Sequence, residues 1–408
     1  MPLTKISQKI LESFFDSYND ISYKPNMNKS ILINFYNTYH KSILLYKKKY
    51  KFQLKKTVSE INNKIFKNDL LKSKYMDIKC KTDILENSNG ILNVSVNING
   101  VQVNLEFMIF NNEDYGNLNK YDLYIEKVIS FLIFLFHFSK RKNPSSIKYY
   151  LYLCKYKKNI PNNKFNVLSG KNCNTGITYG CAKNGQVLIY REEEWFKVLI
   201  HETFHLLCLD FNNMYLDNFN NKFKSIINID SKYNLFESYT EFWASFLNSV
   251  YTATKLSGKK LDNKNFLLYF DFCLNYERIF SLFQCVKVLD HMGLTYKNLI
   301  SKDEISLSLK KLHYKENTNV FAYYIIKMIL LYFNNDFINW CKKNNINNIF
   351  NFNKNEKSLN SFMEFIKKFM YNKNLMKDIN KSLTLLKKFK KENNKFLIET
   401  LRMTVIEI

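Results

Sequence analysis

The sequence is poor in arginine, glycine and proline, and each shortage limits the classes of protein that it fits. Only four of its 61 basic residues are Arg. Arg makes the best bidentate contacts with phosphates and bases, so the net charge of +25 permits nucleic-acid binding without favouring it. Nine Gly and four Pro in 408 residues argue against a turn-rich β-sandwich and favour long helices.

Long apolar runs and closely spaced cysteine pairs are also missing. The longest apolar run, residues 128–138, is well short of the roughly 20 residues that a membrane span needs. The first twenty residues contain no apolar segment of signal-peptide type, and none of the eight Cys belongs to a CxxC pair. We therefore expect an intracellular protein that is not secreted, with free thiols, a buried Cys208 among them, and no membrane span.

The patterns along the chain predict an α+β protein in three parts. Residues 1–75 carry helical stripes and predict a helical N-terminal segment. Residues 76–256 predict a central domain, in which residues 91–110 alternate polar and apolar around Asn99-Gly100 and predict a β-hairpin. Residues 257–408 predict an all-helical C-terminal domain.

Within the central domain, one short motif carries chemistry. A strand predicted over residues 186–190 is followed by a predicted helix, residues 191–210, that contains His201-Glu202-Thr-Phe-His205. Residues four apart lie on one face of a helix, so the two imidazoles can bind one Zn²⁺ while Glu202 reaches a water beside it. Chance predicts on the order of 0.004 such HExxH matches in a chain of this composition.

The next predicted helix, which should begin near Asp230, supplies the third ligand that a zinc site needs. Glu237 and Glu241 share one face of that helix. We expect Glu237 to bind the metal and Glu241 to hydrogen-bond the outer nitrogen of a ligand histidine. Glu241 as the ligand is the alternative.

An HExxH helix followed by an ExxxE helix resembles the gluzincin branch of zinc metallopeptidases, and the compact layout is similar to the minigluzincins. The resemblance covers about residues 118–256 and implies a zincin-like catalytic domain, a Zn²⁺ cofactor and a protein or peptide substrate. It matches His201, His205 and Glu237 to the metal ligands and Glu202 to the general base. Glu241 matches the acidic residue that hydrogen-bonds a ligand histidine.

The stretch QVLIYREEEWFKVLIHETFHLLCLDF, with ESYTEFWA downstream, also resembles uncharacterised metallopeptidases of large DNA viruses. That resemblance implies a viral protein that acts in the host cell or the virion.

In such folds, the strand before the active helix is a sheet edge that binds extended substrate by β-augmentation. Here that strand consists of Gln186, Val187, Leu188, Ile189 and Tyr190. A donor is also needed for the transition-state oxyanion, and the candidates are Tyr323, Tyr324 and His291.

The leading hypothesis is thus a zinc-dependent peptidase, most simply an endopeptidase, that uses Glu202 as general base. Two alternatives stay open. One is a non-catalytic basic virion or scaffold protein in which zinc is a structural clamp. The other is a nucleic-acid-binding protein that uses the positive charge. The sequence does not indicate an oligomeric state.

Overall fold

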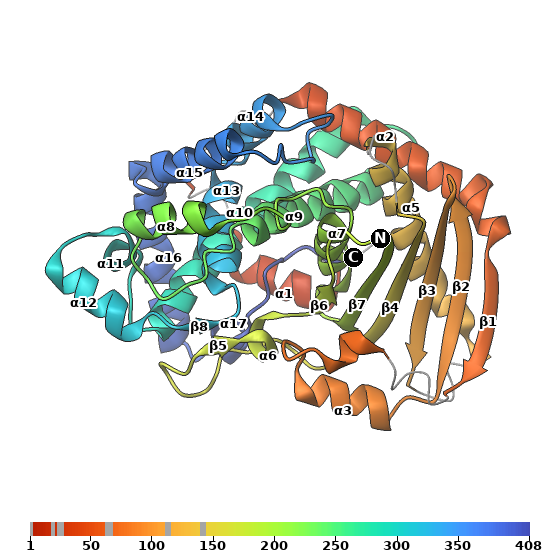
Figure 1. Ribbon diagram of the computed structural model, residues 1–408, viewed down its shortest axis with the longest axis horizontal. Coiled ribbons are helices and arrows are strands. Elements are labelled where there is room, and N and C mark those ends of the chain that lie inside the picture. The colour runs from red at the N-terminus through yellow and green to blue at the C-terminus, as the bar shows by residue number, and fades with distance from the viewer. Residues whose placement is uncertain (1–2, 18–20, 23–27, 62–67, 111–115, 139–143) are drawn as a thin grey trace.

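The structure is a computed structural model that describes residues 3–17, 21–22, 28–61, 68–110, 116–138 and 144–408 (Figure 1). Its strands are β1 (Lys55–Glu60), β2 (Gly90–Ile98), β3 (Val101–Ile109), β4 (Ser146–Cys154), β5 (Leu168–Ser169), β6 (Gly176–Thr178), β7 (Asn184–Arg191) and β8 (Glu316–Asn317). Its α-helices up to residue 256 are α1 (Lys5–Ser13), α2 (Lys29–Lys48), α3 (Ile78–Glu86), α5 (Asp122–Phe138), α6 (Gly170–Cys173), α7 (Trp195–Leu206), α8 (Asp217–Ile226) and α9 (Phe236–Leu256).

The C-terminal part is mostly helical. It contains α10 (Asn263–His291), α11 (Tyr296–Ile300), α12 (Glu304–His313), the π-helix η6 (Phe321–Ile326), α13 (Lys327–Tyr332), α14 (Asn334–Asn344), α15 (Glu356–Met370), α16 (Lys373–Lys391) and α17 (Lys395–Glu399). Among the described residues, no helix combines the length and the apolar character that crossing a membrane requires.

Six strands form one mixed sheet in the order β1-β2-β3-β4-β7-β6. The pairs β3–β4 and β4–β7 are parallel, whereas β1–β2, β2–β3 and β6–β7 are antiparallel. The predicted hairpin is confirmed: β2 and β3 pair in register around Asn99 and Gly100, both of which have positive φ, as a two-residue hairpin turn requires. The expected combination of helices with a small mixed sheet is therefore confirmed at this coarse level.

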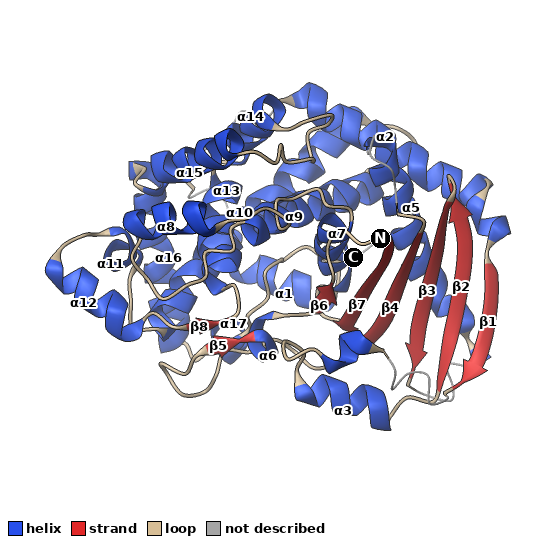
Figure 2. Cartoon of the chain, in the orientation of Figure 1, coloured by secondary structure: helices blue, strands red, loops and turns tan. Residues whose placement is uncertain are grey.

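The six-stranded sheet lies at one side of the molecule and most helices at the other, whereas β5 and β8 lie apart from this sheet (Figure 2). One face of the sheet packs on the main hydrophobic core, which contains α5, α7, α9 and α10. A smaller apolar cluster under α3 covers part of the opposite face, where Cys80 and Ile84 meet Tyr150, Tyr152 and Leu188. Helix α7 packs against β6, β7 and α9, so the sheet and the second helix together fix its position.

Three sequence expectations need correction. Residues 1–75 are not wholly helical, because β1 pairs with β2 at an outer edge of the sheet. Its side chains are all exposed, so the polar sequence KKTVSE shows no alternation that would reveal a strand. The C-terminal part is not all-helical either: β8 pairs with β5, and residues 400–406 are buried outside any helix. Helix α9 begins at Phe236, six residues after the expected start near Asp230.

Candidate metal centre

The two motif histidines lie on α7, and every residue of this helix is buried. Strand β7 leads into α7 through the turn at Glu194, whose backbone is left-handed (φ 60°) and which precedes the helix. His201 and His205 stand one turn apart, with 4% and 6% of their surface exposed, and face the N-terminal end of α9. Because the helix is buried on all sides, the motif lies in the interior.

Three potential ligand atoms converge between α7 and α9. The Nε2 atoms of His201 and His205 are 2.9 Å apart. Oε2 of Glu237 is 3.1 Å from the first and 3.2 Å from the second. Among the described residues, these are the three side chains that form a metal-competent group. The structure thus brings together three residues that the sequence analysis selected.

The geometry and donor types of this group fit zinc. In a tetrahedral site with bonds of about 2.0–2.1 Å, neighbouring ligand atoms are about 3.3 Å apart, close to the separations found here. Two imidazole nitrogens and one carboxylate oxygen are ligands that catalytic zinc sites use, with a fourth position left for water. Burial raises the pKa of Glu237, but the two histidines outweigh it and lower that pKa well below its ordinary value, so the carboxylate is ionised.

His205 has a second partner that the sequence analysis missed. Its Nδ1 atom faces a carboxylate oxygen of Asp210, which is fully buried. Thr240 donates to the same Asp210 oxygen at 3.3 Å, and the backbone N–H of Asn212 donates to the other at 3.2 Å. With a proton on Nδ1, Nε2 presents its lone pair to the metal position. A single Asp five residues after the histidine carries no recognisable sequence signal.

Glu241 lies on the outer side of His201. Its Oε1 atom is 3.4 Å from Nδ1 of His201, and it accepts a hydrogen bond of 2.6 Å from the buried Lys197. It therefore occupies the place behind the histidine, whereas Glu237 lies with the two Nε2 atoms. This arrangement disfavours the alternative in which Glu241 is the third ligand.

Glu202 lies with the cluster in the wall of a cleft of about 930 Å³. Only 7% of its surface is exposed. Burial raises the pKa of Glu202 above its ordinary value, against the opposing effect of His201 and His205. A carboxylate with a raised pKa is better suited to accept a proton near neutral pH than an ordinary Glu.

The expected substrate strand is not the sheet edge. Of the residues Gln186 to Tyr190 of β7, Val187 to Ile189 are paired on both sides, with β4 and with β6. The edge at this end of the sheet is β6, which lines the cleft through Gly176, Ile177 and Thr178. The sequence gives no sign of β6, because three residues in a Gly- and Asn-containing loop are too few to show alternation.

The backbone of β6 is well placed to accept another strand. The N–H of Tyr190 donates to the carbonyl of Thr175, which makes residues 175 and 190 a hydrogen-bonded pair. Pairs alternate along an antiparallel ladder, so Ile177 turns its backbone groups toward β7 while Gly176 and Thr178 turn theirs outward. Gly176 also packs closely on α7: a Cβ there would lie 2.8 Å from Val198 and 3.0 Å from Glu202.

Only one of the three candidates for oxyanion stabilisation is at the cluster. The hydroxyl of Tyr323, in η6, donates to Oε2 of Glu237 at 3.2 Å, and Tyr323 lines the cleft. The other two expectations are corrected. Tyr324 donates to the carbonyl of Leu401 at 2.7 Å, and Nε2 of His291 is 2.9 Å from the carbonyl of Asn166. Adjacent residues of a helix point in different directions, so Tyr323 and Tyr324 cannot both face the cleft.

Two of the cysteines are paired, contrary to the expectation of free thiols. Cys181 and Cys208 form a disulfide with their Cα atoms 4.8 Å apart. The loop after β6 meets the end of α7, where the N–H of Cys181 donates to the carbonyl of His205, and this contact brings the two residues together. The remaining six cysteines are free and buried.

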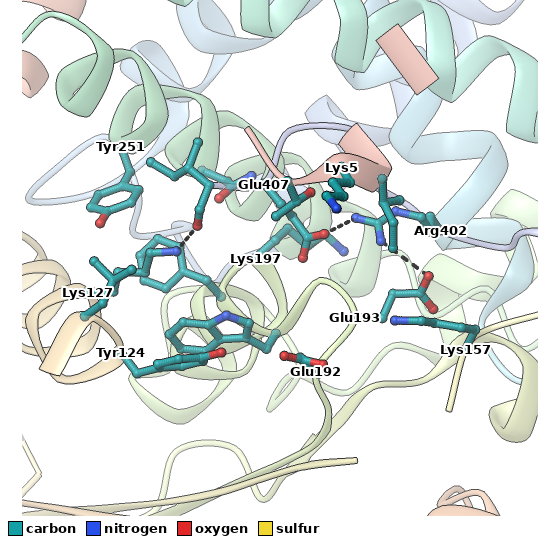
Figure 3. A pocket seen from close by; sticks show the side chains of 17 residues that line it. Lys5, Tyr124, Lys127, Lys157, Glu192, Glu193, Lys197, Tyr251, Arg402 and Glu407 are labelled. Atoms are coloured by element: carbon teal, nitrogen blue, oxygen red, sulfur yellow. Dashed lines mark hydrogen bonds and ion pairs between the residues drawn. The ribbon is translucent and has the colours of Figure 1, made fainter. Parts of the chain in front are cut away.

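A second cavity, of about 440 Å³, lies at the first turn of α7 (Figure 3). Several of its charged side chains have polar partners. Lys127 donates to the carbonyl of Ile408, and Arg402 pairs with Glu193 and Glu407. Lys197, which also lines this cavity, pairs with Glu241. These contacts anchor the C-terminal residues beside α7, and we interpret the cavity as structural.

Comparison with known proteins adds nothing to this geometry. A scan against protein-family models finds no match, and neither a curated protein nor a solved structure matches the chain.

Proposed function

We propose that the protein is a zinc-dependent peptidase, and that its sheet with α7 and α9 is a zincin-like catalytic fold. The observation that carries this proposal is the convergence of His201, His205 and Glu237 in a cleft wall beside Glu202. A purely structural zinc site is closed by four protein ligands and needs no base. Here three ligands and a buried carboxylate face a cleft large enough for a peptide segment.

Each residue has a distinct part in this proposal. When bound, zinc polarises the scissile carbonyl and makes a water more acidic. Glu202 takes a proton from the attacking water and returns it to the leaving amine, a task for which its raised pKa suits it. The hydroxyl of Tyr323, which donates to Oε2 of Glu237 in the structure, donates its hydrogen bond to the oxyanion instead. Burial raises the pKa of Tyr323 well above its ordinary value, so this donor keeps its proton.

The substrate lies along β6 as an added antiparallel or parallel strand. The outward backbone groups of Gly176 and Thr178 hold its main chain, and the close packing of Gly176 on Glu202 sets the distance between substrate and base. Asn317, Thr318 and Asn319 also line this cleft.

The test is peptide hydrolysis by the zinc-loaded protein, with Glu202→Gln as the matched variant. Casein and a mixed peptide library serve as substrates, and zinc content is measured on both proteins. We expect cleavage by the wild type and loss of at least about 100-fold in rate for Glu202→Gln, with zinc retained. Equal turnover by the two proteins would contradict the proposal. A zinc-loaded wild-type protein that cleaves no peptide in the library would also contradict it.

A further inference from the structure

The two carboxylate oxygens of Glu237 have different partners. Oε2 faces the two Nε2 atoms and the hydroxyl of Tyr323. Oε1 accepts a hydrogen bond of 2.9 Å from the side-chain amide of Asn319. Asn319 lies 82 residues further along the chain, in the segment between β8 and η6, and the sequence analysis did not select it.

Asn319 is itself held from two directions. Its Oδ1 accepts a hydrogen bond of 2.9 Å from the amide of Asn234, which precedes α9. Its backbone carbonyl accepts a hydrogen bond of 2.9 Å from the N–H of Tyr323. The backbone carbonyl of Asn234 in turn accepts a hydrogen bond of 3.1 Å from the N–H of Glu237. Reversing the Asn319 amide would set its oxygen against Glu237 and its NH₂ against the NH₂ of Asn234, so the partners fix its orientation.

We propose that Asn319 is a positioning residue that fixes Glu237 for metal binding and couples η6 to the metal centre. This inference rests on the proposed zinc site. A carboxylate bonded at Oε1 is restrained from rotating, and it offers Oε2 alone to the metal. Hydrogen bonds of this kind behind a metal ligand typically contribute 10- to 100-fold to metal affinity. The same residue anchors the first turn of η6 and thereby places the Tyr323 hydroxyl beside Glu237.

The experiment measures the zinc dissociation constant of the full chain by competition with a chromogenic chelator. The variants are Asn319→Ala and Asn319→Leu, the second of which keeps the volume of the side chain without its hydrogen bonds. Asn317→Ala is the matched control, because Asn317 lines the same cleft two residues earlier and no described hydrogen bond joins it to Glu237. Thermal unfolding of the metal-free proteins shows whether each variant folds.

We expect both Asn319 variants to bind zinc about 10- to 100-fold more weakly than wild type, and Asn317→Ala to bind within threefold of it. We also expect the visible spectrum of the Co²⁺-loaded protein to change in Asn319→Leu, since the orientation of a ligand changes. Asn319 variants that fold and bind zinc like wild type, with an unchanged Co²⁺ spectrum, would overturn this inference alone. A wild-type protein that takes up no zinc would instead overturn the proposed function, and this inference with it.

Discussion

Nδ1 of His205 faces the buried carboxylate of Asp210, and this contact orients Nε2 of the second motif histidine toward Glu237 and the proposed metal position. Replacing Asp210 by Ala removes the acceptor that fixes the His205 tautomer. We predict that zinc affinity falls about 10- to 100-fold in Asp210→Ala, as measured by chelator competition.

The control for this change is Asp217→Ala, which removes an exposed acid at the start of α8. This substitution changes the net charge by the same amount as Asp210→Ala but removes no contact of His205. If Asp210→Ala folds and binds zinc as tightly as this control does, Asp210 does not position the ligand.

The outward backbone of β6 gives a prediction about substrate affinity. Thr178→Pro removes one outward N–H without removing a backbone bond to β7, because proline is tolerated at a strand edge. One lost hydrogen bond of about 0.5–1.5 kcal/mol predicts a rise in KM of roughly 2- to 13-fold, with kcat largely kept. Thr178 also donates through its hydroxyl to the carbonyl of Gln186 at 2.7 Å, so Thr178→Val is the control that separates the two effects. A KM that rises equally in both variants would argue against substrate pairing at β6.

Two adjacent tyrosines give a matched pair for the oxyanion role. Tyr323→Phe removes the hydroxyl beside Glu237, whereas Tyr324→Phe removes one that donates to Leu401. We predict that kcat falls about 10²- to 10³-fold in the first variant with zinc still bound, and stays near wild type in the second. Steady-state kinetics on the best library peptide measures both. A normal kcat in Tyr323→Phe would exclude this role.

The lowered pKa of the buried Glu194 carboxylate makes the free energy of unfolding depend on pH. Burial raises its pKa, but the charges of Lys158, Arg402 and Lys197 outweigh it and lower that pKa from 4.5 to about 2. A lowered pKa means that the stabilisation is fully present above about pH 4.5 and is lost as pH falls toward 2. The shift corresponds to roughly 3 kcal/mol of unfolding free energy.

We therefore expect Glu194→Gln to lower the free energy of unfolding at pH 7, and the difference from wild type to shrink below pH 4.5. Urea unfolding at pH 7, 4 and 3 measures it. The neighbouring, half-buried Glu192→Gln is the control. A difference between wild type and Glu194→Gln that stays constant over this range would contradict the linkage.

The residues that could be predicted from sequence are those whose signal is local. The hairpin follows from alternation around Asn99-Gly100, and the pairing of His201 with His205 follows from helical spacing within one turn. Glu237 could be found because it opens the next long amphipathic helix.

The residues that were missed are brought in by tertiary contacts. Asp210 follows the helix in a loop, Asn319 comes from a segment 82 residues away, and β6 is too short to show a period. Periodicity also could not choose between Tyr323 and Tyr324, since both lie in one apolar helical stretch and only the packing of η6 decides which of them faces the cleft.

The zinc content of purified full-length protein, measured by elemental mass spectrometry beside His205→Ala and Glu237→Gln, tests the proposed metal centre most directly. We predict one zinc per wild-type chain and a large loss of zinc in both variants, with Glu241→Gln retaining most of the metal. A folded wild-type protein without zinc, or variants that keep a full complement of it, would contradict the assignment of His201, His205 and Glu237 as the metal centre.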